Sequence, residues 1–128
     1  MSKRETPMTR WYWQQTGGLL IEEFPLVKAG PGGAARFADG LIVLDEPTGI
    51  GTARSFKIEG RDVIVVQTKA KRLGMYLMGQ TLFSLELVRR MGPKTAHAVA
   101  LCVEDDIVMR SLLEGHEGCS VAVYPTQP

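Results

Sequence analysis

The amino-acid sequence predicts an α/β domain in which a mixed β-sheet carries helices on its faces. Its N-terminal half contains several extended segments in succession, whereas its C-terminal half alternates a helical pattern with an extended one. Successive strands joined by turns pair antiparallel, and a helix between two strands leaves those strands parallel. The chain of 128 residues is long enough for one domain over 1–128 and too short for two ordinary ones.

The N-terminal half is expected to supply a short helix and a three-stranded meander. Residues 1–7 are polar and expected to be disordered, and Gly17 and Gly18 close a short helix or turn over 8–18. Gly and Pro mark 30–35 as a loop, and 46–52 is expected to be another. The expected extended segments are 19–29, 36–45 and 63–69, the last within a hairpin over 54–70 that turns near 59–62.

The C-terminal half is expected to form two helix–strand units. Apolar residues cover most of the circumference of a helix over 73–91, which predicts a buried helix, and Gly92-Pro93 ends it. The segment 95–103 is apolar on both faces, as in a strand at the centre of a covered sheet. A second helix over 105–115 and a last strand over 119–125 complete the domain.

The composition argues against several classes of protein. A net charge of +1 is too small for a non-specific polyanion binder, so any contact with nucleic acid must come from a local patch. Cys102 and Cys119 lack metal-type spacing and are expected to be small buried residues rather than a disulfide framework. No stretch is long enough for a membrane span, and the N-terminus lacks the apolar core of a signal peptide, which favours a cytoplasmic protein without a membrane partner.

The candidate site lies where the strand 63–69 ends. Four β-branched residues suit the middle of a sheet, but Gln67, Thr68 and Lys69 follow without any turn residue. Because successive strand residues point to opposite faces, Gln67 and Lys69 share one face and stand about 7 Å apart. The same residues also have a plainer interpretation, as the end of a strand that emerges into water.

Asp39 is the carboxylate expected to join these two residues. It lies near the start of 36–45, and if that strand is antiparallel to 63–69, its beginning lies beside the end of the other. Asp45, at the far end, is about 20 Å away by strand rise. A carboxylate and further oxygens can hold Mg²⁺ or Mn²⁺, and a neighbouring lysine can stabilise negative charge on a phosphate.

These residues, in this order of elements, resemble the PD-(D/E)XK nuclease superfamily, which has the restriction-endonuclease-like fold. The family core is α-β-β-β-α-β, in which an Asp opens the second strand and an acidic-x-Lys tripeptide ends the third. The corresponding residues here are Asp39 and Gln67-Thr68-Lys69. The resemblance implies that Asp39, Gln67 and the Thr68 carbonyl bind the metal and that Lys69 is the catalytic lysine.

The resemblance also implies supporting residues. Family members often carry another Glu from the first helix or strand, and the strand pattern does not choose between Glu22 and Glu23. Some carry a Gln on the helix after the third strand, where Gln80 stands here, and Lys71 and Arg72 would contact backbone phosphates.

Two departures from the family pattern leave two functions open. Gln67 replaces the acidic residue, which removes a charge from the metal site, and Ser84 stands where an extended signature has Tyr. The favoured function is a metal-dependent nuclease that hydrolyses phosphodiester bonds of DNA or RNA, with DNA favoured. The alternative is a catalytically weak or inactive nuclease-like module that binds nucleic acid or a protein partner. A homodimer would enlarge the substrate groove of so small a domain.

Two other groups of residues have competing interpretations. Trp11 and Trp13 could stack on bases, although we expect at least one of them to pack across the sheet. His97 lies on an expected central strand and is interpreted as an interior histidine rather than a ligand.

Overall fold

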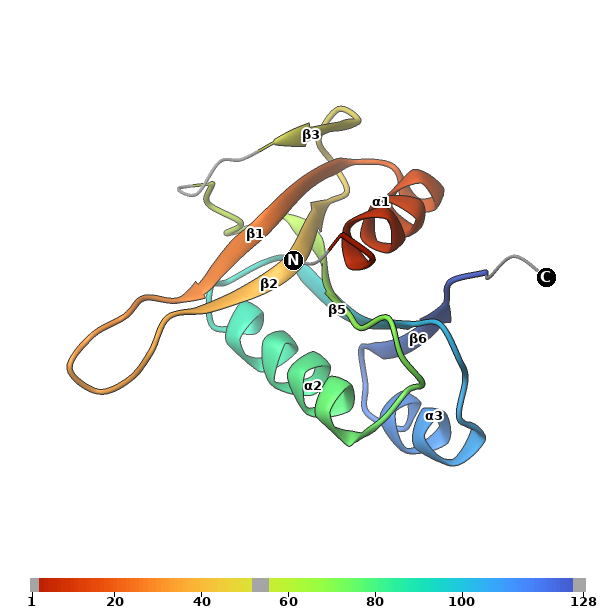
Figure 1. Cartoon of the computed structure of the whole chain (residues 1–128). Coiled ribbons are helices and arrows are strands. Elements are labelled where there is room, and N and C mark those ends of the chain that lie inside the picture. Colours follow the sequence, from red (N-terminus) through yellow and green to blue (C-terminus); the bar gives the residue numbers. More distant parts are fainter. Residues whose placement is uncertain (1–2, 52–55, 126–128) are drawn as a thin grey trace.

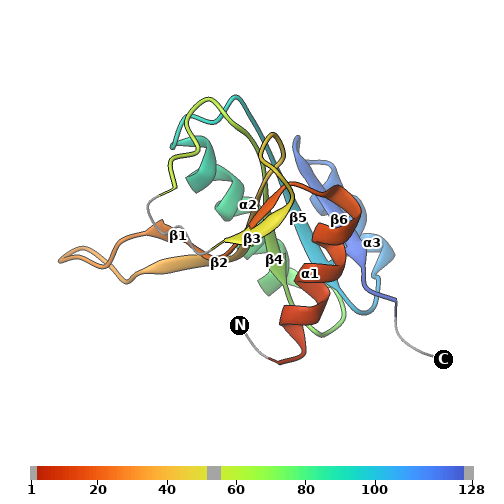
Figure 2. The same cartoon turned by 90° about the horizontal axis from the view of Figure 1, so that it is seen from above.

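Three helices and six strands make up the described part of the chain, residues 3–51 and 56–125 of a computed structural model. The helices are α1 Glu5–Thr16, α2 Met75–Arg89 and α3 Ile107–Glu114. The strands are β1 Leu19–Val27, β2 Arg36–Val43, β3 Gly49–Gly51, β4 Asp62–Thr68, β5 Thr95–Cys102 and β6 Cys119–Val123. Helix α1 covers one face of the sheet, and α2 and α3 cover the other (Figures 1 and 2).

The sheet has the strand order β3-β1-β2-β4-β5-β6 and combines both kinds of pairing. Strands β1, β2 and β4 form an antiparallel meander, whereas β5 pairs parallel with both β4 and β6. Helix α2 connects β4 to β5 and α3 connects β5 to β6, so a helix joins each parallel pair. The predicted α/β class with a mixed sheet is therefore confirmed.

Two apolar clusters, one on each face of the sheet, hold the layers together. On one face, Met8 of α1 packs with Leu20 and Val66. On the other, residues of α2 and α3 pack against the strands, and the free thiols Cys102 and Cys119 belong to this cluster, as expected of small buried residues. Strand β4 has apolar residues in both clusters, which explains its continuous β-branched run.

Helix α1 begins earlier than the sequence suggested. It starts at Glu5, so the prediction of disorder over 1–7 is wrong for residues 5–7, while residues 1 and 2 lie outside the described part. Pro7 is compatible with this start because the first helical turn does not need its missing N–H. The helix ends before Gly17, whose φ of 70° is easily adopted by glycine, and this end was expected.

Two predictions about the N-terminal half are wrong. The expected loop over 46–52 contains β3, which pairs parallel with β1 at the edge of the sheet. The expected hairpin over 54–70 does not form in its described part, because residues 56–61 contain no strand. Residues 52–55 lie outside the described part. Strand β4 pairs with β2 and β5 instead, so long-range partners replace the local one.

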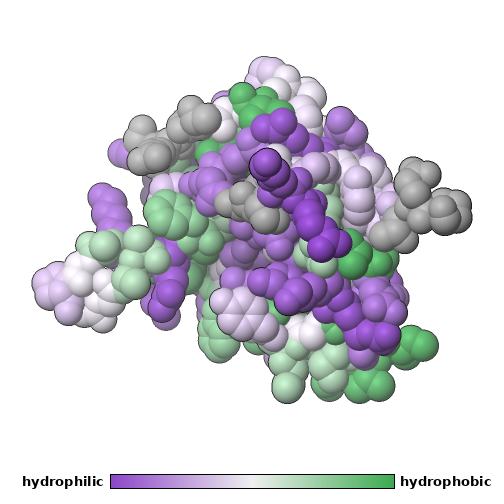
Figure 3. Space-filling model, viewed as in Figure 1, coloured by the Kyte–Doolittle hydropathy of each residue, from purple (hydrophilic) through white to green (hydrophobic). Residues whose placement is uncertain are grey.

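Apolar side chains also lie on the outer surface of α2 and α3. Met75, Tyr76 and Phe83 are exposed on α2, and Ile107 and Val108 are exposed on α3. Figure 3 shows apolar residues gathered at the lower right of the molecule, over α3. These side chains are exposed, so packing of the core does not explain them.

Candidate functional site

Strand β4 presents alternate residues to the two helical layers, as the period of a strand requires. On the α2 side, Gln67 Nε2 donates a 2.7 Å hydrogen bond to Ser84 Oγ, and Lys69 Nζ lies 5.5 Å from the centre of the Tyr76 ring. Thr68 points to the α1 side. The shared face of Gln67 and Lys69 is therefore confirmed. The strand does not simply emerge into water, because Gln67 is only 4% exposed.

Strands β2 and β4 separate at this point and leave a fork in the sheet. Their last pair is Gly40 with Val66. Beyond it, the N–H of Thr68 donates to Asp39 Oδ2 at 2.7 Å, so a side-chain carboxylate takes the place of a backbone acceptor. The N–H of Lys69 points the other way, to β5. Because the N–H and C=O of one strand residue point to the same neighbour, the Thr68 carbonyl is directed toward the fork.

A local irregularity in β1 and β2 aims Asp39 at the fork. The pairing of the two strands skips Glu23 and Asp39, which stand opposite each other. Glu23 has a φ of 52°, which is uncommon for a residue other than glycine. Leu20 and Phe24 of β1 pack in clusters on opposite faces, so the alternation of side chains shifts between them. Irregularities of this kind re-aim side chains next to functional sites.

The surroundings of the Asp39 carboxyl disfavour its charged form. Its pKa is raised to about 6, chiefly by burial and in smaller part by the nearby carboxylates of Glu5 and Glu23, while the hydrogen bond from the Thr68 N–H acts in the opposite direction. A partly buried carboxyl that titrates close to neutral pH is a candidate for proton transfer or for binding a cation. A cation at the fork would relieve the repulsion among these carboxylates.

The structure distinguishes between the two candidate carboxylates of β1. Glu22 accepts hydrogen bonds of 2.9 and 3.0 Å from Arg10 of α1, which occupies both of its oxygens. Glu23, by contrast, contributes to the electrostatic environment of Asp39. Glu23 is thus the better placed of the two, and Glu22 belongs to an ion pair that joins β1 to α1.

Sequence reasoning missed Glu5. Its Oε2 accepts a 3.4 Å hydrogen bond from the N–H of Ala70, two residues after the end of β4, and its charge raises the pKa of Asp39. The prediction that residues 1–7 are disordered excluded it. Pro7 was the available signal, since proline in the first turn marks the start of a helix and would have placed Glu5 on it.

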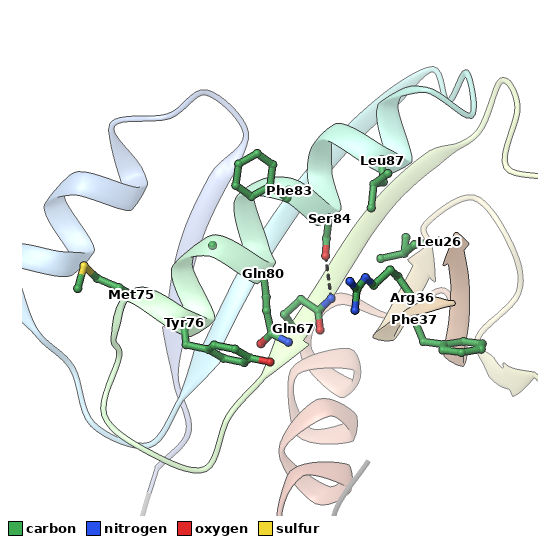
Figure 4. A pocket seen from close by; sticks show the side chains of 11 residues that line it. Leu26, Arg36, Phe37, Gln67, Met75, Tyr76, Gln80, Phe83, Ser84 and Leu87 are labelled. Carbon is green, nitrogen blue, oxygen red and sulfur yellow. Dashed lines mark hydrogen bonds between the residues drawn. The ribbon is translucent and has the colours of Figure 1, made fainter. Parts of the chain in front are cut away.

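The residues at the fork offer only a few protein ligands for Mg²⁺. In the described part of the chain, no group of three or more His, Cys, Asp and Glu side chains is arranged to hold a metal. Mg²⁺ often uses one or two carboxylates together with water and substrate phosphate, and Asp39 with the Thr68 carbonyl meets that need. Gln67 is turned toward α2, so only its Oε1, on the far side of the amide from Ser84, remains for a ligand (Figure 4).

Gln67 and Lys69 face two adjoining cavities rather than a common one. The larger cavity has a volume of about 470 Å³ and is lined by Gln67, Gln80 and Ser84 together with residues of β2 (Figure 4). Lys69 lines a smaller cavity of about 330 Å³, and Tyr76 lines both. Asp39 lines neither of them. The fork therefore lies beside the cavities instead of inside either one.

Two of the expected phosphate-binding residues also line the smaller cavity. Lys71 and Arg72 do so with Lys69, and Lys71 is exposed. Arg72 forms a 2.8 Å ion pair with Glu104, and both side chains are 58% exposed. Because such exposed pairs contribute little free energy, Arg72 can exchange Glu104 for a phosphate at small cost.

The aromatic residues of α1 belong to the core layer and not to the site. Trp13 Nε1 donates a 2.8 Å hydrogen bond to the Gly18 carbonyl, and the ring of Trp11 meets Tyr124 edge to face at 5.4 Å. Both tryptophans pack against the cluster on the α1 face, as expected. His97 is exposed on β5, so its interpretation as an interior histidine is wrong.

None of the three described helices has the length and apolar character that crossing a bilayer requires. Comparisons of the chain with protein-family models, with curated proteins and with solved structures find no match.

Proposed function

We propose that this protein is a metal-dependent phosphodiesterase that cleaves nucleic acid, with its reaction centre at the fork between β2 and β4. The observation that carries the proposal is the carboxylate of Asp39 in the fork, 2.7 Å from the backbone nitrogen of Thr68, the last residue of β4, with Lys69 next in the chain. A partly buried acid, a backbone carbonyl and a lysine at one strand end suit phosphoryl chemistry.

The arrangement of the elements supports the same proposal. Helix α1, the meander β1-β2-β4, helix α2 and strand β5 follow the order of the restriction-endonuclease-like core. Asp39 lies on the second strand of the meander, and the tripeptide from Gln67 to Lys69 ends the third, next to α2. In this interpretation β3, α3 and β6 are additions around the core.

The residues of the fork have separate roles in this proposal. Asp39 and the Thr68 carbonyl hold Mg²⁺ or Mn²⁺, which when bound neutralises phosphate charge and acidifies a water. Glu5 and Glu23 keep the fork negative and so favour a cation. The ammonium of Lys69 now rests over the Tyr76 ring and would turn to the phosphate as charge develops on it.

A second candidate function is binding of nucleic acid without cleavage. It is favoured by Gln67, whose amide is neutral and is bonded to Ser84 where an active relative would have an acid facing the metal. It is also favoured because the described residues contain no group of three or more His, Cys, Asp and Glu side chains that could hold a metal. A lower charge weakens metal binding, and a slow or inert centre follows from that.

Cleavage assays with matched variants test the proposal. We expect labelled single- and double-stranded DNA or RNA to be cleaved with Mn²⁺, and Asp39→Asn and Lys69→Met each to reduce the rate on the order of a hundredfold or more. Lys94→Met is the control, because Lys94 precedes β5 beside the opposite end of β4. Equal cleavage by wild type and Lys69→Met would contradict the role of Lys69. No cleavage with any metal would favour the binding module.

A further inference from the structure

The larger cavity has walls that the chemistry at the fork does not use. Tyr76 at the start of α2 and Phe37 on β2 are 72% and 50% exposed, although both are large aromatic side chains. Figure 4 shows them on opposite sides of the amides of Gln67 and Gln80. Exposed aromatic rings around a hollow are typical of surfaces on which the bases of a single strand stack.

The floor between these rings is polar and has unmet hydrogen-bonding capacity. Gln67 is nearly buried, and with Nε2 bonded to Ser84 it turns its Oε1 away from α2 (Figure 4). Among the described residues, Gln80 and Arg36 have no side-chain hydrogen bond or ion pair. Amides and a guanidinium without protein partners offer the donors and acceptors that read the edge of a base and bind a phosphate.

The charge around the cavity favours an anion. Arg36 lines it directly, and the segment 24–38, which forms the projecting β1–β2 hairpin, contains Lys28 and Arg36 but no acidic residue (Figure 1). On the other side, Lys69 lies against Tyr76, which the two cavities share. A volume of about 470 Å³ is within the usual range of small-molecule sites.

We propose that this cavity binds unpaired nucleotides of a single strand that crosses it from Tyr76 to Phe37. One base stacks on the ring of Tyr76 and another on Phe37, base edges meet Gln67 and Gln80, and Arg36 binds a phosphate. The proposal deepens the proposed function, because it makes single-stranded segments or frayed ends the substrate of the fork. It also stands on geometry separate from the fork, since Asp39 does not line the cavity.

Base stacking has a spectroscopic signature that tests the proposal without cleavage. The probe is a ten-nucleotide DNA of mixed sequence with 2-aminopurine at internal positions, measured in EDTA as a single strand and as a blunt duplex. We expect the single strand to bind with quenched 2-aminopurine fluorescence and the duplex to bind more weakly. Tyr76→Ala and Phe37→Ala should each weaken binding about tenfold and reduce the quenching, since each removes a ring on which a base stacks.

Matched controls separate the cavity from general surface effects. Leu112→Ala removes an exposed apolar side chain on α3, and Arg90→Gln removes an exposed positive charge after α2, so both should bind like wild type. Arg36→Gln should weaken binding without abolishing quenching. All five substituted side chains are exposed, so the variants should fold, and circular dichroism checks this.

The outcomes distinguish this proposal from the proposed function. If binding quenches the fluorescence and depends on Tyr76 and Phe37, but no metal supports cleavage, the proposal for the cavity stands and the proposed nuclease function is wrong. If the protein cleaves nucleic acid and both alanine variants cleave it equally well, the proposed nuclease function stands and the proposal for the cavity is wrong. A stable dimer in sedimentation that Phe83→Ala dissociates, together with no quenching, would assign the cavity to a second copy of the chain and overturn the proposal.

Discussion

At the scale of the residue, Asp39 combines a structural and a chemical role. Its carboxylate accepts the hydrogen bond that a backbone carbonyl of β2 would otherwise accept, and so it ends the β2–β4 ladder. Burial makes its charged form costly. A residue that destabilises the fold in its ionised state is expected where function, rather than stability, determines its identity.

The pH dependence of stability tests the environment of Asp39. Its folded pKa of about 6 is above the ordinary 3.8, so between these values the folded state keeps a proton that the unfolded state has lost. The free energy of unfolding therefore falls as pH rises from about 4 to about 6, by at most about 3 kcal/mol. Asp39→Asn should remove this fall, and urea denaturation at several pH values measures it.

Asp45→Asn is the control for that measurement. The hydrogen bond and charge of Arg61 lower the pKa of the exposed Asp45 carboxyl, so its effect has the opposite sign and appears only as pH drops. The Asp45 variant should therefore retain the fall in stability between pH 4 and 6. Parallel curves for wild type and Asp39→Asn would show that Asp39 ionises freely in the folded protein.

At the scale of the element, the position of α1 depends on close contact with β2. A Cβ on Gly40 would lie 2.9 Å from Leu20 Cδ1 and 3.1 Å from Thr9 Cγ2. Glycine thus lets α1 approach the sheet, where the hydroxyl groups of Thr9 and Thr68 are 2.8 Å apart and hydrogen-bonded. The same approach brings Glu5 to the end of β4.

Alanine substitution of two glycines tests this contact. Gly40→Ala should lower the free energy of unfolding by about 1–3 kcal/mol, because Leu20 and Thr9 are fully buried and have little space to move. Gly79→Ala, inside α2 with open space around it, should instead raise that free energy by up to about 1 kcal/mol. Thermal unfolding measures both, and a neutral Gly40→Ala would mean that α1 can shift away from the sheet.

At the scale of the whole molecule, positive charge is concentrated at a few residues and is not spread over the surface. The net charge is only +1, yet Lys69 and Lys71 line one cavity and Arg36 the next. The positive groups of the two cavities therefore come from β2 and from the segment between β4 and α2. Binding of nucleic acid should depend on these few residues and not on a broad basic surface.

The salt dependence of binding measures how many charges take part. Neutralisation of about three phosphates of a single strand predicts a slope of about −2 in a plot of log affinity against log salt concentration. Arg36→Gln should reduce the slope by roughly 0.7, and Lys94→Met should leave it unchanged. Fluorescence anisotropy between about 50 and 200 mM salt gives these slopes. A much steeper slope would contradict a local site.

Local sequence patterns predicted most helices and strands, and they predicted which residues of β4 share a face. The period of two placed Gln67 and Lys69 on one face, and apolar residues around most of a helix predicted α2, because burial imposes both patterns along a single segment. The antiparallel relation of Asp39 to the end of β4 followed from element order alone, and the structure has it. Strand β3 escaped prediction because three residues carry no period.

What the sequence determined by itself was the α/β class, the order of the elements apart from β3 and the residues at the end of β4. Only the tertiary structure decided which carboxylates surround Asp39, since Glu5 reaches it through the packing of α1, and the contact between Glu22 and Arg10 joins distant segments. The same holds for the cavity of Tyr76 and Phe37, whose walls come from α2 and β2. Periodicity records which side of an element is buried, whereas a site depends on distances between elements, and those distances are fixed by packing.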